Sequence, residues 1–93
     1  MRYENEFYNF LLSEKTISSE KAIRSRMSKA RKAEQVLNLT LDAVVADDDL
    51  MYKSLAMLSQ HEDPAHAPMQ NALRKYYKFI NNKEFPRMKN FKH

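Results

Sequence analysis

The stretch Ala72-Leu73-Arg74-Lys75-Tyr76-Tyr77-Lys78-Phe79-Ile80 combines apolar residues with three basic ones. A helix through it would group four apolar side chains on one face, at the spacing of an amphipathic helix: Met69, Leu73, Tyr76 and Ile80. The opposite face would present polar side chains: Gln70, Asn71, Arg74 and Lys78. The first face can build a core. The second offers the cations and amides that a helix uses against nucleic acid.

The whole chain has 93 residues, which predicts one small domain that buries about 60–65% of its unfolded surface. It contains no Cys, so disulfides and thiolate metal sites are excluded. No apolar run approaches the roughly 20 residues of a membrane span, and the N-terminus lacks a signal-peptide pattern. We expect a cytoplasmic protein without membrane contact. The absence of Gly favours helices over tight hairpins and excludes the glycine-rich phosphate-binding loops.

Charge is distributed in blocks along the chain. Lys and Arg minus Asp and Glu give −2 for residues 1–14, +6 for 15–32, −6 for 33–63 and +6 for 64–93. The two basic blocks can converge into one positive surface in a compact fold. The alternative is that they are only solvated helix faces.

Three further helices are expected, over residues 3–13, 19–38 and 48–60, with Ser18 or Ser19 capping the second. The second has an inner stripe of apolar residues: Ile23, Met27, Ala30, Ala33 and Leu37. Its outer stripe is polar and mostly basic: Lys21, Arg24, Ser25, Ser28, Arg31, Lys32 and Gln35. Like charges packed so densely favour a partner that neutralises them.

The remaining segments are expected to be connections and caps. Residues 39–45 predict a connection with one helical turn. The three carboxylates at 47–49 fit a helix N-terminus better than a cation site. The fourth helix begins at Pro64 or Pro68. Phe85 is expected to fold back onto the core, and residues 87–93 form a basic tail, either an arm that follows phosphates or a disordered end.

No metal, cofactor or enzyme is predicted. His61 and His66 lack a third ligand at zinc spacing. No nucleophile is placed beside a base, and no paired carboxylates lie in an apolar setting. We therefore expect no catalytic residues and a binding function.

The order of these segments resembles the N-terminal core-binding domain of tyrosine recombinases and phage integrases. Phe7 to Leu12 followed by residues 13–18 is similar to that family's FL…E…LS opening, and residues 73–80 are similar to its LRxFYRFL segment. The resemblance implies a compact four-helix SAM-like bundle over residues 1–86, followed by the basic tail. It also implies binding to double-stranded DNA without cleavage, because the sequence ends where that family's catalytic domain would begin. The chain is then a small standalone protein or part of a larger one.

In that family the second and fourth helices face the duplex. Carried over by position, the DNA-binding residues are Lys21, Arg24, Ser25, Ser28, Arg31, Lys32, Gln70, Asn71, Arg74, Lys75 and Lys78. Lys and Arg would contact phosphates, while Gln70, Asn71, Arg24 or Arg74 would reach base edges. The alternative hypothesis is a small protein-protein interaction module whose basic faces meet an acidic partner.

Overall fold

The computed structural model describes residues 1–14, 19–63 and 65–86, and this part of the chain folds into five α-helices. They are α1 (Glu4–Ser13), α2 (Glu20–Leu37), α3 (Leu41–Val45), α4 (Asp48–Ser59) and α5 (Pro68–Asn81). The all-α class is confirmed, and the four expected helices lie close to their predicted bounds. The connection predicted at 39–45 holds the short helix α3, so the described chain has five helices rather than four.

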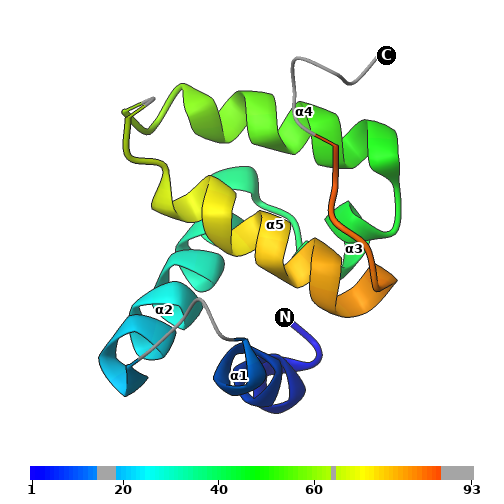
Figure 1. Cartoon of the computed structure of the whole chain (residues 1–93). Coiled ribbons are helices and arrows are strands. Elements are labelled where there is room, and N and C mark those ends of the chain that lie inside the picture. Colours follow the sequence, from blue (N-terminus) through cyan, green and yellow to red (C-terminus); the bar gives the residue numbers. More distant parts are fainter. Residues whose placement is uncertain (15–18, 64, 87–93) are drawn as a thin grey trace.

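Helix α5 lies at the centre of the bundle. In Figure 1 it crosses the middle of the molecule, with α4 above it and α1 and α2 below it. It packs against each of the other four helices, and its largest contact is with α2. Residues 72–80 therefore lie in the helix around which the other helices assemble.

The buried arc of α5 is wider than the single apolar stripe predicted for it. Met69, Leu73 and Tyr76 are buried as expected. Tyr77 is only 1% exposed, because neighbours on several sides cover more than one face of this helix. Ile80, which was expected in the core, is 37% exposed. It lies in the last turn before the helix ends at Asn81, so the prediction for Ile80 was wrong.

The helix ends explain how a chain without glycine stops its helices. Ser19 caps α2, its Oγ accepting from the Ala22 N–H at 3.1 Å. Asp47 caps α4 by accepting from two backbone N–H groups, which confirms capping for this carboxylate. Asn38 and Asn82 end α2 and α5 in the left-handed region, at φ 55° and 58°. Asn is the common substitute for Gly at such positions.

The inner stripe predicted for α2 is confirmed in full, since all five of its residues are buried. Ala30 and Ala33 are 0% exposed. Because alanine adds only a methyl group, α2 can lie close to α5 along these positions. The stripe leaves the opposite face of α2 directed away from the core.

Two adjacent tyrosines connect α5 to α3 and α4. The Tyr76 hydroxyl donates to Asp42 of α3, and the Tyr77 hydroxyl donates to Asp48 of α4 at 2.8 Å. Burial is the main cause that raises the pKa of Tyr77 to about 12, and the neighbouring carboxylate of Asp48 is the second cause. The same two causes raise the pKa of Tyr76. Both hydroxyls therefore stay protonated at neutral pH and act as hydrogen-bond donors.

The segment after α5 returns to the bundle, as predicted for Phe85. Phe85 is 4% exposed, and its ring lies edge-on to Tyr77 with 5.1 Å between the centroids. In Figure 1 this segment rises from the end of α5 towards α4. The basic tail predicted at 87–93 and the alternative cap Ser18 lie outside the described residues. Of the two starts predicted for the last helix, Pro68 is confirmed and Pro64 is wrong, because residues 65–67 are not helical.

Candidate nucleic-acid interface

The exposed face of α2 is the largest part of the predicted DNA surface. The six residues predicted to contact DNA from this helix are all exposed: Lys21, Arg24, Ser25, Ser28, Arg31 and Lys32. Within the described residues, Lys21 and Lys32 form no ion pair. Four cations and two hydroxyls are thus open to solvent on one helix.

The charge of the protein is concentrated on this helix. Residues 20–37 contain six Lys and Arg against two Glu, a formal charge of +4. The whole chain also has a formal charge of +4, so everything outside α2 sums to zero. One of the two glutamates, Glu34, has partners within the protein: it accepts from Leu41 N at 2.8 Å and from the Met1 amino group at 2.8 Å.

Two further cations of α2 were missed by the sequence prediction. Arg26 and Lys29 are partly buried, on the opposite edge of the inner stripe from Arg24 and Arg31. Burial lowers the pKa of Arg26. The available signal was spacing, because Arg26 follows the inner residue Ile23 by three positions and so borders the buried stripe.

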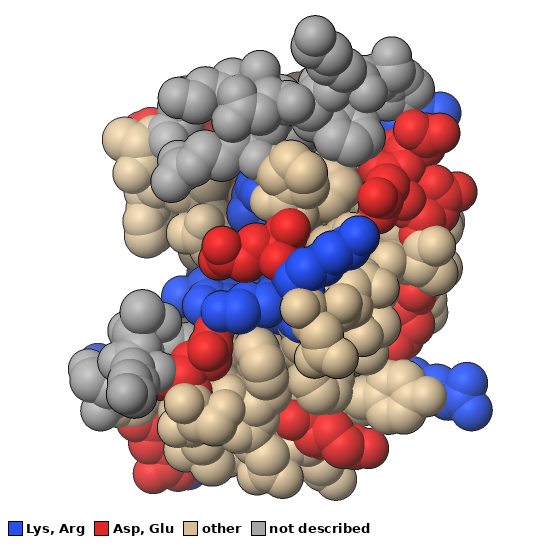
Figure 2. Space-filling model, turned by 45° about the vertical axis from the view of Figure 1, so that its right-hand side comes forward, with Lys and Arg blue, Asp and Glu red and all other residues tan. Residues whose placement is uncertain are grey.

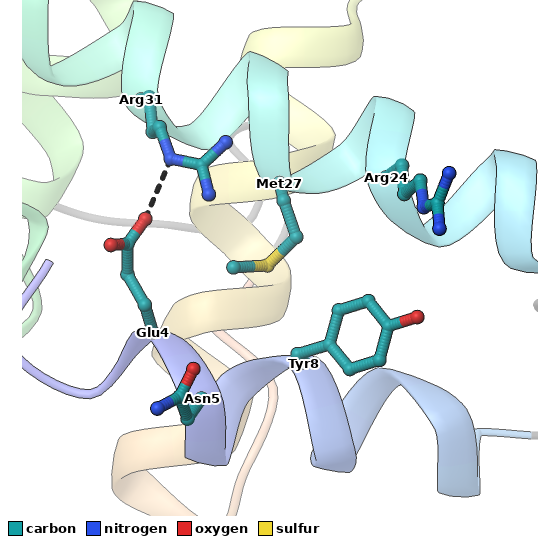
Figure 3. A pocket seen from close by; sticks show the side chains of 6 residues that line it. All are labelled: Glu4, Asn5, Tyr8, Arg24, Met27 and Arg31. Carbon is teal, nitrogen blue, oxygen red and sulfur yellow. Dashed lines mark hydrogen bonds and ion pairs between the residues drawn. The ribbon is translucent and has the colours of Figure 1, made fainter.

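Arg24 and Arg31 face α1, and together with it they form a groove of about 200 Å³ (Figure 3). The groove is lined by Glu4, Asn5, Tyr8, Arg24, Met27 and Arg31. Arg31 Nε donates to Glu4 Oε1 at 2.6 Å, and Arg24 Nη2 donates to Glu20 Oε1 at 2.6 Å within α2. Both arginines are well exposed, at 55% and 73%, so these pairs contribute little to stability.

The lysines predicted on α5 are brought together by the carboxylate of Glu14, the residue that follows α1. Lys75 Nζ lies 2.8 Å and Lys78 Nζ lies 3.3 Å from the same oxygen, Glu14 Oε1. The hydrogen bond from Lys75 is the main cause that lowers the pKa of Glu14, while burial opposes it and Lys78 lowers it further. Two of the predicted DNA contacts therefore share one counter-charge within the protein.

Glu14→Gln should lower the free energy of unfolding by about 0.5–1 kcal/mol at neutral pH, because both lysines lose their counter-charge. The folded-state pKa of Glu14 is the lowered one. Its contribution is therefore complete above the ordinary pKa of 4.5 and is lost as pH falls through the lowered value. Urea unfolding should separate wild type and variant at pH 7, and the difference should shrink as the pH falls below 4.5.

Glu6→Gln is the matched control for this measurement. Glu6 is exposed on α1, the helix that Glu14 follows, and forms no ion pair among the described residues. Its substitution removes the same charge from α1. An equal loss in both variants would show that Glu14 acts through general charge rather than through Lys75 and Lys78.

Arg74 and Gln70, predicted to reach base edges, are also engaged inside the protein. Arg74 Nη1 donates to the carbonyl oxygens of Phe85 at 3.1 Å and Pro86 at 3.4 Å, and its guanidinium lies over the Phe85 ring. The side-chain Nε2 of Gln70 donates to Glu62 Oε2 at 3.4 Å. Asn71 remains exposed. On α5 the predicted set is thus mainly a set of internal contacts.

Figure 2 shows one face of the molecule, on which basic side chains form a band across the middle with carboxylates close above and below it. This mixture fits the internal pairing found on α5. A surface with both signs interleaved attracts a polyanion less than one on which cations stand alone.

Among the described side chains, no three His, Asp or Glu residues come close enough together to hold a metal ion. None of the described helices is both long enough and apolar enough to cross a bilayer.

No protein-family model matches the chain, and neither the curated proteins nor the solved structures gave a match.

Proposed function

We propose that this chain is a DNA-binding helical module in which α2 is the principal contact helix. The observation that carries the proposal is the exposed face of α2, where cations and hydroxyls lie together on the helix that bears a charge equal to that of the whole protein. Phosphate contacts from Lys and Arg supply most of the affinity of such an interface. The exposed hydroxyls of Ser25 and Ser28 add neutral contacts between them.

Helix α5 has a different part in this proposal from the one expected from sequence. Lys75 and Lys78 already share Glu14, and Arg74 is bound to backbone carbonyls. The side chains of the two lysines are also only 21% and 35% exposed, against 73% and 55% for the two arginines predicted on α2, so a phosphate reaches them less easily. Helix α5 therefore serves mainly as the scaffold that holds α2 in place, and the DNA surface narrows to α2 and its immediate neighbours.

A relationship to the core-binding domains of tyrosine recombinases is part of the proposal. It is supported by the order of a short first helix, a long basic second helix and an aromatic last helix, and by the sequence similarities in residues 7–18 and 73–80. On this proposal the compact SAM-like bundle spans residues 1–86, and the chain binds duplex DNA but does not cut or rejoin it.

Lys32→Glu should weaken duplex binding by about tenfold at low salt, because a phosphate contact is replaced by repulsion. Fluorescence anisotropy with a labelled duplex, at about 50 and 200 mM salt, measures both affinity and its salt dependence. The slope of log affinity against log salt should fall by about one unit in the variant.

Lys53→Glu is the matched control, since Lys53 is exposed on α4 and its reversal changes net charge by the same amount. It should change affinity far less than Lys32→Glu. If wild-type protein binds no duplex at low salt, the proposal fails, and the result favours the alternative of a protein-protein interaction module. Equal losses in both variants would show attraction by net charge alone and reject α2 as the contact helix.

A further inference from the structure

The groove between α1 and α2 is lined by two arginines that keep hydrogen-bond donors the fold does not use. Arg31 donates from Nε to Glu4, and Arg24 donates one N–H of Nη2 to Glu20. A guanidinium has five N–H donors in a planar fork, so both arginines keep further donors available. Figure 3 shows the terminal nitrogens of Arg31 turned away from Glu4, towards the space above Met27.

The walls between these arginines are less polar. Met27 projects from α2 between Arg24 and Arg31, and the Tyr8 ring rises from α1 below Arg24 (Figure 3). Met27 is 4% exposed, so it forms the floor rather than a protruding wall. The groove thus pairs cationic donors with a ring and a thioether, a combination that suits an anionic group attached to an apolar frame.

The size of the groove limits what can occupy it. Sites that bury a whole small-molecule ligand usually measure about 300–1,000 Å³. At about 200 Å³, this groove is smaller than such sites and open to solvent. An open groove of this size suits one unit of a longer polymer that continues over the surface beside it.

We propose that the groove receives one phosphodiester group of a bound DNA strand, an inference that rests on the proposed DNA-binding function. The phosphate lies between the guanidinium groups of Arg24 and Arg31, while Met27 and the Tyr8 ring pack against the adjoining deoxyribose. The strand then continues along the exposed face of α2. Helix α1 thereby becomes part of the interface, and Asn5 and Tyr8 join the DNA-contacting residues.

Asn5→Asp should weaken binding to a short duplex by about tenfold at low salt, because it places a carboxylate beside the phosphate. Asn9→Asp adds the same charge to the same exposed surface of α1, one turn away and outside the groove, and should weaken binding less than about threefold. Circular dichroism confirms that both variants remain helical.

A second pair of variants acts in the opposite direction, so that unfolding cannot imitate its effect. Glu4→Gln releases Arg31 and should raise duplex affinity by about two- to fivefold, more than Glu6→Gln, which removes a carboxylate of α1 outside the groove. If wild-type protein binds duplex but the members of each pair behave alike, the groove assignment is overturned and the DNA-binding function stands.

NMR shift titrations distinguish the sources of the anion. Duplex should shift the amide signals of Asn5, Tyr8 and Arg31. If inorganic phosphate shifts them equally at the same concentration of phosphate groups, the groove is a site for free anions and the proposal fails. Shifts caused by a Glu-rich peptide but not by duplex would overturn it in favour of an acidic protein partner. No duplex binding anywhere would reject the proposed function itself.

Discussion

Phe7→Ala should lower the free energy of unfolding by about 3–5 kcal/mol, the usual cost of truncating a fully buried phenylalanine. Phe7 is 0% exposed, and its ring lies 5.0 Å from Tyr76 and 5.6 Å from Phe79, centroid to centroid. It is therefore a main side chain through which α1 packs on α5. The total free energy of unfolding of a small domain is about 5–15 kcal/mol, so the variant would keep only a small part of its stability.

Thermal unfolding followed by circular dichroism measures this effect. For a chain of this length, each kcal/mol corresponds to roughly 4–8 °C in the midpoint. Phe10→Ala is the comparison, because Phe10 is on the same helix and belongs to the same aromatic group but is only partly buried. It should cost clearly less. Equal costs would contradict the central place given to Phe7.

The position of α1 also matters for the proposed DNA surface. Phe7 and Leu11 are buried on one side of the helix, and this fixes Glu4 and Tyr8 opposite Arg31 and Arg24. Weakening the Phe7 contact should therefore loosen the groove before it disturbs the exposed lysines of α2. The Phe7 ring therefore contributes both to the stability of the protein and to the shape of the groove.

The success of the prediction for α2 has a physical reason. A helix that buries only one stripe shows it as a 3.6-residue period, and Ile23, Met27 and Leu37 follow that period closely. The exposed face is then known by elimination. Helix α5 does not behave in this way, because neighbours on several sides bury Tyr77 as well as Tyr76, and no single stripe describes it.

The sequence could not predict which cations were already paired. Glu14 is 61 residues from Lys75 and 64 from Lys78, and its position after the first helix gives no sign of either contact. Arg31 and Glu4 are likewise 27 residues apart. Local periodicity tells which side chains face outward, but only the packing of α1 beside α2 and α5 decides which of them meet a carboxylate.

Phe85→Ala should lower the free energy of unfolding by about 3 kcal/mol, although Phe85 lies beyond the last helix. Its side chain is 4% exposed and packs on Tyr77, while Arg74 binds its carbonyl oxygen and covers its ring. Glu84→Ala is the control, since Glu84 precedes Phe85 in the same segment and is exposed. Urea unfolding should show a large loss for Phe85→Ala and almost none for Glu84→Ala.

A variant of Arg74 tests whether this residue contacts DNA or only stabilises the segment that holds Phe85. Arg74→Met keeps an apolar stem against the Phe85 ring but removes the hydrogen bonds to the two carbonyls, so it should cost about 1–2 kcal/mol, less than Phe85→Ala. A loss of duplex affinity in Arg74→Met that exceeds that of Phe85→Ala would return Arg74 to the DNA surface. If affinity instead follows stability in both variants, Arg74 acts by holding the last segment against α5.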